Sequence, residues 1–166
     1  WIPQEPTLQN FQELFKRAEE APVLRWFFNS VLVAGTGTVC YLLLTSMAAY
    51  AFSRLQFPGR NVLFFIVIAT LTIPGQVTII PVFLLLQKLH WFNTYYALVV
   101  PGLAGAFGVF LLRQFFLTIP KELEEAALID GCGRAGIYWR VILPLGKPAL
   151  ATLAIFSFLG GWNDFM

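Results

Sequence analysis

Charged residues are scarce in this chain of 166 residues, of which only 12% are Asp, Glu, Lys or Arg. Soluble domains average about 25% charged residues. The chain is also 58% hydrophobic, with a mean hydropathy of +0.71, and a small soluble domain cannot bury so much apolar surface. We therefore exclude a soluble domain and expect lipid around the protein. The net charge of +2 is too small to indicate a nucleic-acid partner.

Cysteine and histidine are scarce as well, which excludes two further classes of site. Cys40 and Cys132 lie far apart in the sequence and His90 is the single histidine, so neither a disulfide framework nor a metal-ligand spacing is present. The sequence has no glycine-rich phosphate loop of the Walker type and no plausible pair of nucleophile and base. We expect no enzymatic activity and no cofactor in this chain.

Long uncharged runs dominate what is present, at residues 26–53, 61–87, 89–112 and 148–163. The first three exceed the ~20 residues that a helix needs to cross a bilayer. Their apolar residues do not alternate, and in lipid only helices or closed barrels satisfy the backbone. The sequence therefore predicts an all-α, polytopic membrane helical bundle. We expect its spans at about 27–52, 61–87, 95–113 and 148–165.

The basic residues indicate which side of the membrane each loop faces. Residues 53–60 and 113–147 carry seven Lys or Arg, and the segments on the opposite side carry four, so the positive-inside rule makes the first side cytoplasmic. Residues 1–25 are amphipathic at helical spacing and predict an interfacial helix on the periplasmic side, or alternatively a partner-binding helix. The permease domain would occupy 26–166. Because the chain starts without Met and stops just after an apolar run, we expect it to be part of a longer protein.

Two spans contain residues that disturb or tighten helix packing. The second contains Pro74 and Pro81, and proline removes a backbone donor and kinks a helix. We predict one kinked helix; the alternative is a span that ends near Pro74, followed by an interfacial helix. The third span is rich in small residues, as is the first at Gly35 and Gly37. Such residues allow close helix packing, or alternatively a moving interface between helices.

The loop 114–147 is the most charged part of the chain. Pro120 and the glutamates that follow it suit the start of a helix, and Gly131 and Gly133 suit its end. A second helical stretch would then run up to Pro144. The loop could be a solvated amphipathic segment, but its apolar content is too high for a free loop. We expect part of it to pack in a groove, either on its own bundle or on another protein.

The loop also resembles a known signature. The run Glu125-Ala126-Ala127-Leu128-Ile129-Asp130-Gly131, with Ile142-Leu143-Pro144 ten residues later, resembles the EAA loop through which permeases of ATP-binding cassette (ABC) importers contact their ATPase subunits. The version with Asp before the glycine resembles the maltose-type carbohydrate uptake group, and within it the second permease subunit. The resemblance covers nearly the whole chain. Cys132 and Gly133 depart from it, since the family usually has Ala and Ser there.

The resemblance implies a fold, partners and site residues. The fold would be that of a type I importer permease, with the first and last of its usual six spans outside this sequence. The partners would be ABC ATPase subunits that bind ATP and Mg, a second permease, an extracytoplasmic solute-binding protein, membrane lipid and a sugar-class solute. The location would be the cytoplasmic (inner) membrane of a bacterium or archaeon, crossed several times. The residues implied in ATPase coupling are Glu125, Ala126, Ala127, Asp130, Gly131, Ile142, Leu143 and Pro144.

Candidates for solute contact come from the residues themselves. Polar side chains inside membrane spans are functional candidates, and Gln76 and Asn163 lie in or at the end of spans. We therefore expect them along the path of a sugar, a related polyol or a glycerol phosphate. The competing interpretation of the whole chain is a structural or assembly membrane protein whose loop docks a partner other than an ATPase.

Overall fold

The structure is a computed structural model that describes residue 12 and residues 22–164. No β-strand occurs in the described part of the chain, and the predicted all-α fold is confirmed. The segment predicted over residues 1–25 lies almost wholly outside the described residues. The helices are α2 (Val23–Arg54), α3 (Arg60–Ala69), η1 (Thr70–Thr72), α4 (Gly75–Lys88), α5 (Tyr95–Val99), η2 (Val100–Leu103), α6 (Ala106–Thr118), α7 (Glu122–Ile129), α8 (Arg134–Ile137), η3 (Tyr138–Ile142), α9 (Leu143–Leu145) and α10 (Lys147–Trp162).

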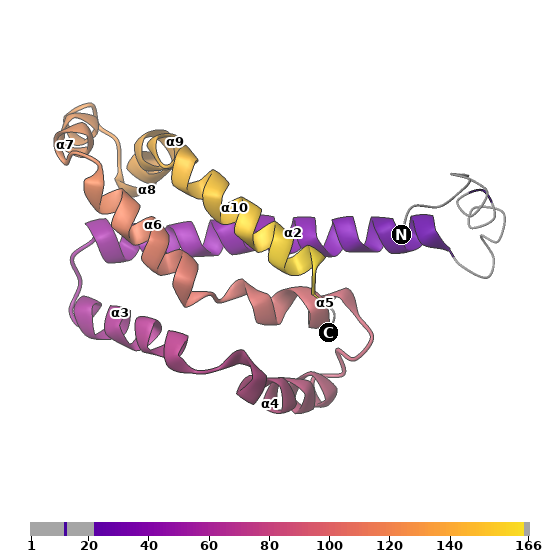
Figure 1. The fold of residues 1–166 in the computed structure, drawn as a ribbon. Helices are drawn as coiled ribbons and strands as arrows, with labels where there is room; N and C mark the ends of the chain where they lie inside the picture. Colours follow the sequence, from indigo (N-terminus) through magenta and orange to yellow (C-terminus); the bar gives the residue numbers. More distant parts are fainter. Residues whose placement is uncertain (1–11, 13–21, 165–166) are drawn as a thin grey trace, which may run out of the picture.

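One helix is the axis of the molecule. α2 runs along its length, α6 and α10 cross it and pack against it, and α3 and α4 form a separate arm on the other side (Figure 1). Where α2, α6 and α10 meet the segment 137–142, apolar side chains form the core, including the fully buried Leu112, Phe116, Ile142 and Leu153. The core therefore lies toward the end of α2 that carries Arg54.

Length and composition allow two counts of membrane spans. α2 alone is long and apolar enough to cross a bilayer. Three bent helix pairs would bring the number to four if each counted as one span: residues 60–88, 95–118 and 134–162. These pairs bend by 101°, 45° and 77°. The second and third predicted spans are therefore interrupted helices, whereas the fourth corresponds to α10, which follows the bend of its pair.

The break in the pair 60–88, the second predicted span, differs from the single kinked helix that we predicted. The first part ends at η1, Ile73 is extended (φ −82°, ψ 114°), and α4 begins at Gly75. Proline disfavours the helical conformation of the residue before it, and Pro74 therefore ends one helix and starts the next. Pro81 lies inside α4 without ending it. The alternative of a helix that stops near Pro74 describes the structure better.

Small residues pack closely against another helix at the start of α6, but not in the first half of α2. A Cβ added at Gly108 would lie 2.8 Å from the methyl carbon of Thr45, and one at Gly105 would lie 2.5 Å from the ring of Tyr41. The backbone N–H of Gly108 also donates to the Tyr41 hydroxyl at 3.2 Å. A Cβ at Gly35 or Gly37 would have no neighbour within 4 Å. Close packing therefore holds for α6 against α2, and not for the first glycines of α2.

Candidate functional site: the α7 surface and a polar cavity

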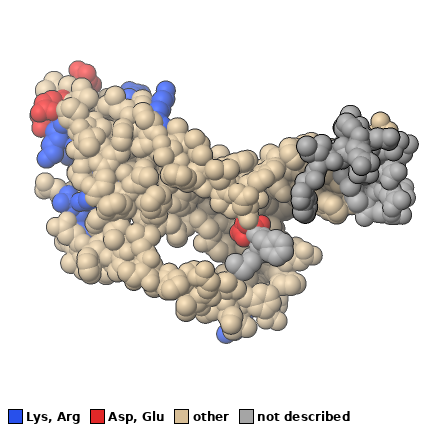
Figure 2. Space-filling view, viewed as in Figure 1, with Lys and Arg blue, Asp and Glu red and all other residues tan. Residues whose placement is uncertain are grey.

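Charged side chains gather at the end of the molecule that carries α7, while most of the visible surface is uncharged (Figure 2). α7 itself begins after Lys121 and has Glu122, Glu124 and Glu125 in its first turn. Acidic residues at this end of a helix interact favourably with its dipole. Pro120 lies just before the helix and not in its first turn.

A glycine turn ends α7. Gly131 has φ +83°, its N–H donates to the carbonyl of Leu128 at 3.0 Å, and the N–H of Cys132 donates to that of Ala127 at 2.9 Å. This pair of bonds is a Schellman motif, which favours glycine because the left-handed conformation strains other residues. Gly133 is extended instead and precedes α8. The helix, sharp turn and second helical segment follow the predicted order.

The segment after the turn packs on the protein's own bundle. Ile137, Tyr138 and Ile142 are buried in the core. The Tyr138 hydroxyl shares a 2.8 Å hydrogen bond with Ser46 Oγ, and its ring lies 5.3 Å from that of Tyr50. This half of the loop therefore uses its apolar residues to attach itself to α2.

α7 has one face on the bundle and one free. Glu124 and Ala127 face the bundle, where Glu124 is buried and Ala127 packs against the core. The outer face of α7 consists of the exposed residues Glu122, Glu125, Ala126 and Ile129, at helical spacing. Ile129 is 87% exposed, an unusual position for so apolar a side chain. The outer face is therefore an acidic and apolar surface that the described residues, 12 and 22–164, leave exposed.

Some of the coupling residues predicted from the resemblance are exposed, and others are buried against the bundle. Glu125, Ala126, Asp130, Gly131 and Pro144 are exposed, Ala127 and Leu143 are partly buried, and Ile142 is fully buried. The acidic and small residues are thus open to a partner. Ile142 lies in the core, where it holds the loop on the bundle.

An ion pair beneath α7 was missed by sequence reasoning. Arg54 Nε lies 2.9 Å from Glu124 Oε1, with side chains 3% and 8% exposed. Neither atom makes an aligned hydrogen bond, so the contact is an ion pair. Arg54 Nη2 donates to the backbone carbonyls of Phe116 and Ile119 at the end of α6, where the helix dipole favours a cation. In the sequence analysis Arg54 contributed only to the count of basic residues on the cytoplasmic side. Its position directly after a long uncharged run was the sequence feature that could have indicated a structural role.

A cavity of about 970 Å³ lies against the opposite half of α2. We call it the polar cavity for its hydrophilic side chains, although apolar ones such as Val33, Phe83 and Leu98 line it as well. Its lining includes side chains from α2, the segment before α5, and the end of α10: Arg25, Asn29, Ser30, Thr38, Asn93, Thr94, Tyr95, Trp162 and Asp164. The Tyr95 hydroxyl donates to Asn29 Oδ1 at 2.9 Å. Thr38 is 8% exposed, and its Oγ1 has no hydrogen-bond partner. Gln76 and Asn163, predicted along the solute path, are exposed and do not line this cavity.

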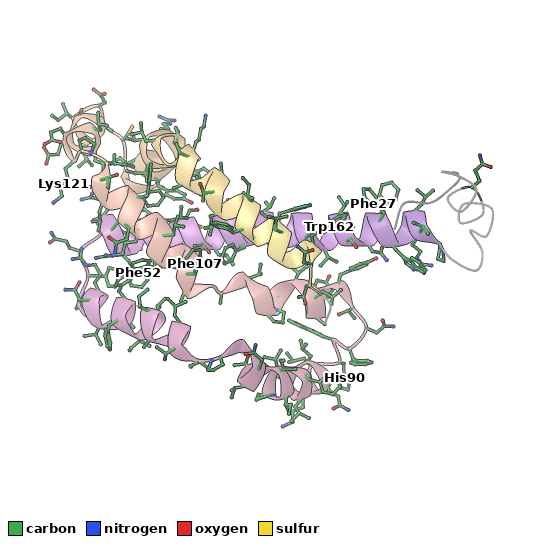
Figure 3. All side chains as sticks on the ribbon, in the orientation of Figure 1. Phe27, Phe52, His90, Phe107, Lys121 and Trp162 are labelled. Carbon is green, nitrogen blue, oxygen red and sulfur yellow. The ribbon has the colours of Figure 1, made fainter. Side chains whose placement is uncertain are left out.

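The two features lie far apart on the molecule. Figure 3 shows Lys121, beside α7, at one end, and Trp162, which lines the cavity, far along α2 from it. Within the described residues, no cluster of His, Cys, Asp or Glu could hold a metal ion. The exposed face of α7 and the cavity thus lie at different ends of α2.

Comparison with known proteins shows the family of this chain. The family described as "Binding-protein-dependent transport system inner membrane component" matches residues 41–166. The chain belongs to this family. Its members are transport subunits of the inner membrane, and the prediction of a transport subunit rather than an enzyme is confirmed.

Several curated permeases of this family are similar over most of the chain. The arabinooligosaccharides transport system permease protein AraQ of Halalkalibacterium halodurans is 41% identical over 96% of the chain and 57% of its own length. The diacetylchitobiose uptake system permease protein NgcG of Streptomyces coelicolor is 37% identical over 97% and 54%. The sn-glycerol-3-phosphate transport system permease protein UgpE of Yersinia enterocolitica is 39% identical over 88% and 52%. The chain thus spans little more than half the length of these relatives.

A solved structure gives the fold. A crystal structure of a bacterial ABC transporter that imports the acidic polysaccharide alginate matches with a TM-score of 0.75 and 34% identity, over 82% of this chain and 48% of the other. The predicted resemblance to carbohydrate importer permeases, and the type I importer fold, are confirmed.

Proposed function

We propose that this chain is the membrane-spanning part of a permease subunit in an ATP-driven importer that depends on a solute-binding protein. The solute would be a sugar, a related polyol or a glycerol phosphate. ATP and Mg would be bound by partner ATPase subunits, which dock on α7, and a second permease would complete the path. The protein would cross the cytoplasmic membrane of a bacterium or archaeon several times.

The observation that carries the docking role is the outer face of α7. It presents the side chains of Glu125 and Ala126 beside an apolar Ile129 that is 87% exposed. Helix-in-groove docking suits a short helix of this kind. The small Ala126 would allow close approach, and Glu125 would pair with a basic group of the ATPase.

The polar cavity supports a hydroxyl-rich solute. Hydroxyl and amide side chains such as Thr38, Asn29, Ser30 and Asn93 line it, and sugars are bound through hydrogen bonds to such groups together with aromatic rings. Trp162 supplies an aromatic ring at the same wall. The names of the relatives, which include oligosaccharide and glycerol-phosphate systems, support the same class of solute. Gln76 and Asn163 remain predicted path residues.

Cysteine cross-linking in the full-length transporter tests the docking role. With Cys40 and Cys132 replaced by alanine, a single cysteine would be placed at Ile129 in α7, or at His90 as an exposed control at the opposite end of the molecule (Figure 3). We expect Ile129→Cys to cross-link to the ATPase subunit with an efficiency that ATP changes, and His90→Cys to give no such product. Equal cross-linking at both positions would contradict the proposal. Capture of a partner other than an ATPase by α7 would favour the structural or assembly role.

A further inference from the structure

We infer that the ion pair between Arg54 and Glu124 fixes the orientation of α7 on the bundle, and that it transmits movement between α7 and α2. This positioning role rests on the proposed docking function of α7. It assigns to Arg54 and Glu124 a part in coupling that is distinct from binding the ATPase.

The contacts of Arg54 join three helices at one point. Its Nε lies 2.9 Å from Glu124 Oε1 at the start of α7, and its Nη2 donates to the carbonyls of Phe116 and Ile119 at the end of α6. Arg54 is itself the last residue of α2. A planar guanidinium fixes the direction of several acceptors at once, as a flexible ammonium cannot. The pair is therefore suited to hold α7 at a set angle to α2 and α6.

Adjacent glutamates in α7 lie in different surroundings. The Glu124 side chain is 8% exposed and faces the bundle, whereas Glu125 lies on the outer face. Glu124 therefore contacts the bundle and Glu125 is available to a partner. The Arg54–Glu124 pair is a salt bridge between α2 and α7, and the other inward contacts of α7 include the small Ala127.

α2 extends from this point to the polar cavity. It is one uninterrupted helix of 32 residues, about 48 Å long at 1.5 Å per residue. Its other half supplies Asn29, Ser30 and Thr38 to the cavity wall. A displacement of α7 that α2 follows would therefore move the cavity wall. Without the ion pair, α7 could turn on its two flanking loops while α2 stayed in place.

Glu124→Gln is the test variant, since it removes the charge and keeps the size of the side chain. The full-length permease would be assembled with its partner permease, ATPase and binding protein in proteoliposomes. We expect the ATPase to co-purify at the wild-type level. The amount of solute transported per ATP hydrolysed should fall about fivefold or more, which is the lower end of the typical range for coupling between two sites of a protein. Arg140→Gln, which removes a charge from an exposed side chain outside α7, is the control and should keep the wild-type ratio.

A distance measurement separates positioning from a loss of folding. Spin labels at Gln56, just beyond α2, and at Glu122 in α7 would be placed at exposed positions, with Cys40 and Cys132 replaced by alanine. We expect one narrow distance distribution in the wild type and a broad one in Glu124→Gln. Arg54→Lys, which keeps the charge but loses the planar group, should broaden it to a lesser degree.

The outcomes distinguish this inference from the proposed function. A Glu124→Gln transporter with the wild-type transport ratio and a narrow distance distribution would overturn the positioning role while the docking role stood. Loss of ATPase co-purification in Glu124→Gln would also overturn it, because Glu124 would then belong to the binding surface. A wild-type complex in which ATP drives no transport would refute the proposed function itself.

Discussion

The two halves of α2 lie in different surroundings although both are mostly apolar helix. The anchored half, residues 41–54, buries Thr45, Ser46, Ala49, Tyr50 and Ser53 and carries the contacts to α6 and to the loop after α7. In the open half, residues 23–38, only Ala34 and Thr38 are buried, and the polar cavity lies against it. The anchored half is suited to transmit force, and the open half to face a solute.

The largest effect should come from removing the cation at the end of the anchored half. Arg54→Ala would leave the Glu124 carboxylate buried without its partner, a change that destabilises proteins by about 3–5 kcal/mol. We expect a large drop in the melting temperature of the purified full-length permease. Arg140→Ala, at an exposed arginine of the same end, should change it little. An equal drop in both variants would mean that the ion pair contributes no more than a surface charge.

The second largest loss of stability should come from a substitution where α6 closely approaches the anchored half. Gly108→Ala would place a methyl group against Tyr41 and Thr45, and overpacking of this kind costs about 1–3 kcal/mol. Gly35→Ala, in the open half, meets no neighbour within 4 Å and should be neutral or slightly stabilising. Thermal unfolding of the two variants would compare the halves directly, and a reversed order would refute the difference in packing.

A smaller effect should follow from the hydrogen bond between the anchored half and the loop. Tyr138→Phe removes the 2.8 Å contact to Ser46 Oγ, while the serine keeps its bond to the Leu43 carbonyl. Since no donor is left without a partner, we expect a loss of about 1 kcal/mol in the free energy of unfolding. Tyr96→Phe, at an exposed tyrosine of α5, is the control and should lose almost nothing.

The smallest change in stability should come from a substitution in the open half, at Thr38. Its main effect should be on transport. Thr38→Val keeps the shape of the side chain and removes a buried hydroxyl that has no partner, so stability should rise by up to about 1 kcal/mol. The solute concentration for half-maximal transport should increase if this hydroxyl binds the solute. Thr36→Val, at an exposed threonine whose hydroxyl bonds to the Leu32 carbonyl, should leave it unchanged. Equal transport curves would remove Thr38 from the solute path.

The sequence predicted local structure well where a strong local preference decides it. Pro74 ends a helix because of its own ring, and Gly131 ends α7 because it accepts a positive φ. The predicted single kinked helix was wrong because Ile73, directly before Pro74, is extended and so ends the first helix. The apolar residues of the loop after α7 were expected to need a groove, and Ile137 and Ile142 find it on their own bundle.

By itself, the sequence determined the membrane class of this protein, its helical fold and the EAA loop, because uncharged runs and a local spaced motif encode them. Only the tertiary structure decided which glutamate of α7 faces inward, and that Arg54 is its partner. Only the tertiary structure, too, brought Thr38 and Trp162 to one cavity. The physical reason is separation along the chain: Arg54 and Glu124 lie seventy positions apart, and no local periodicity relates residues that meet only when helices pack.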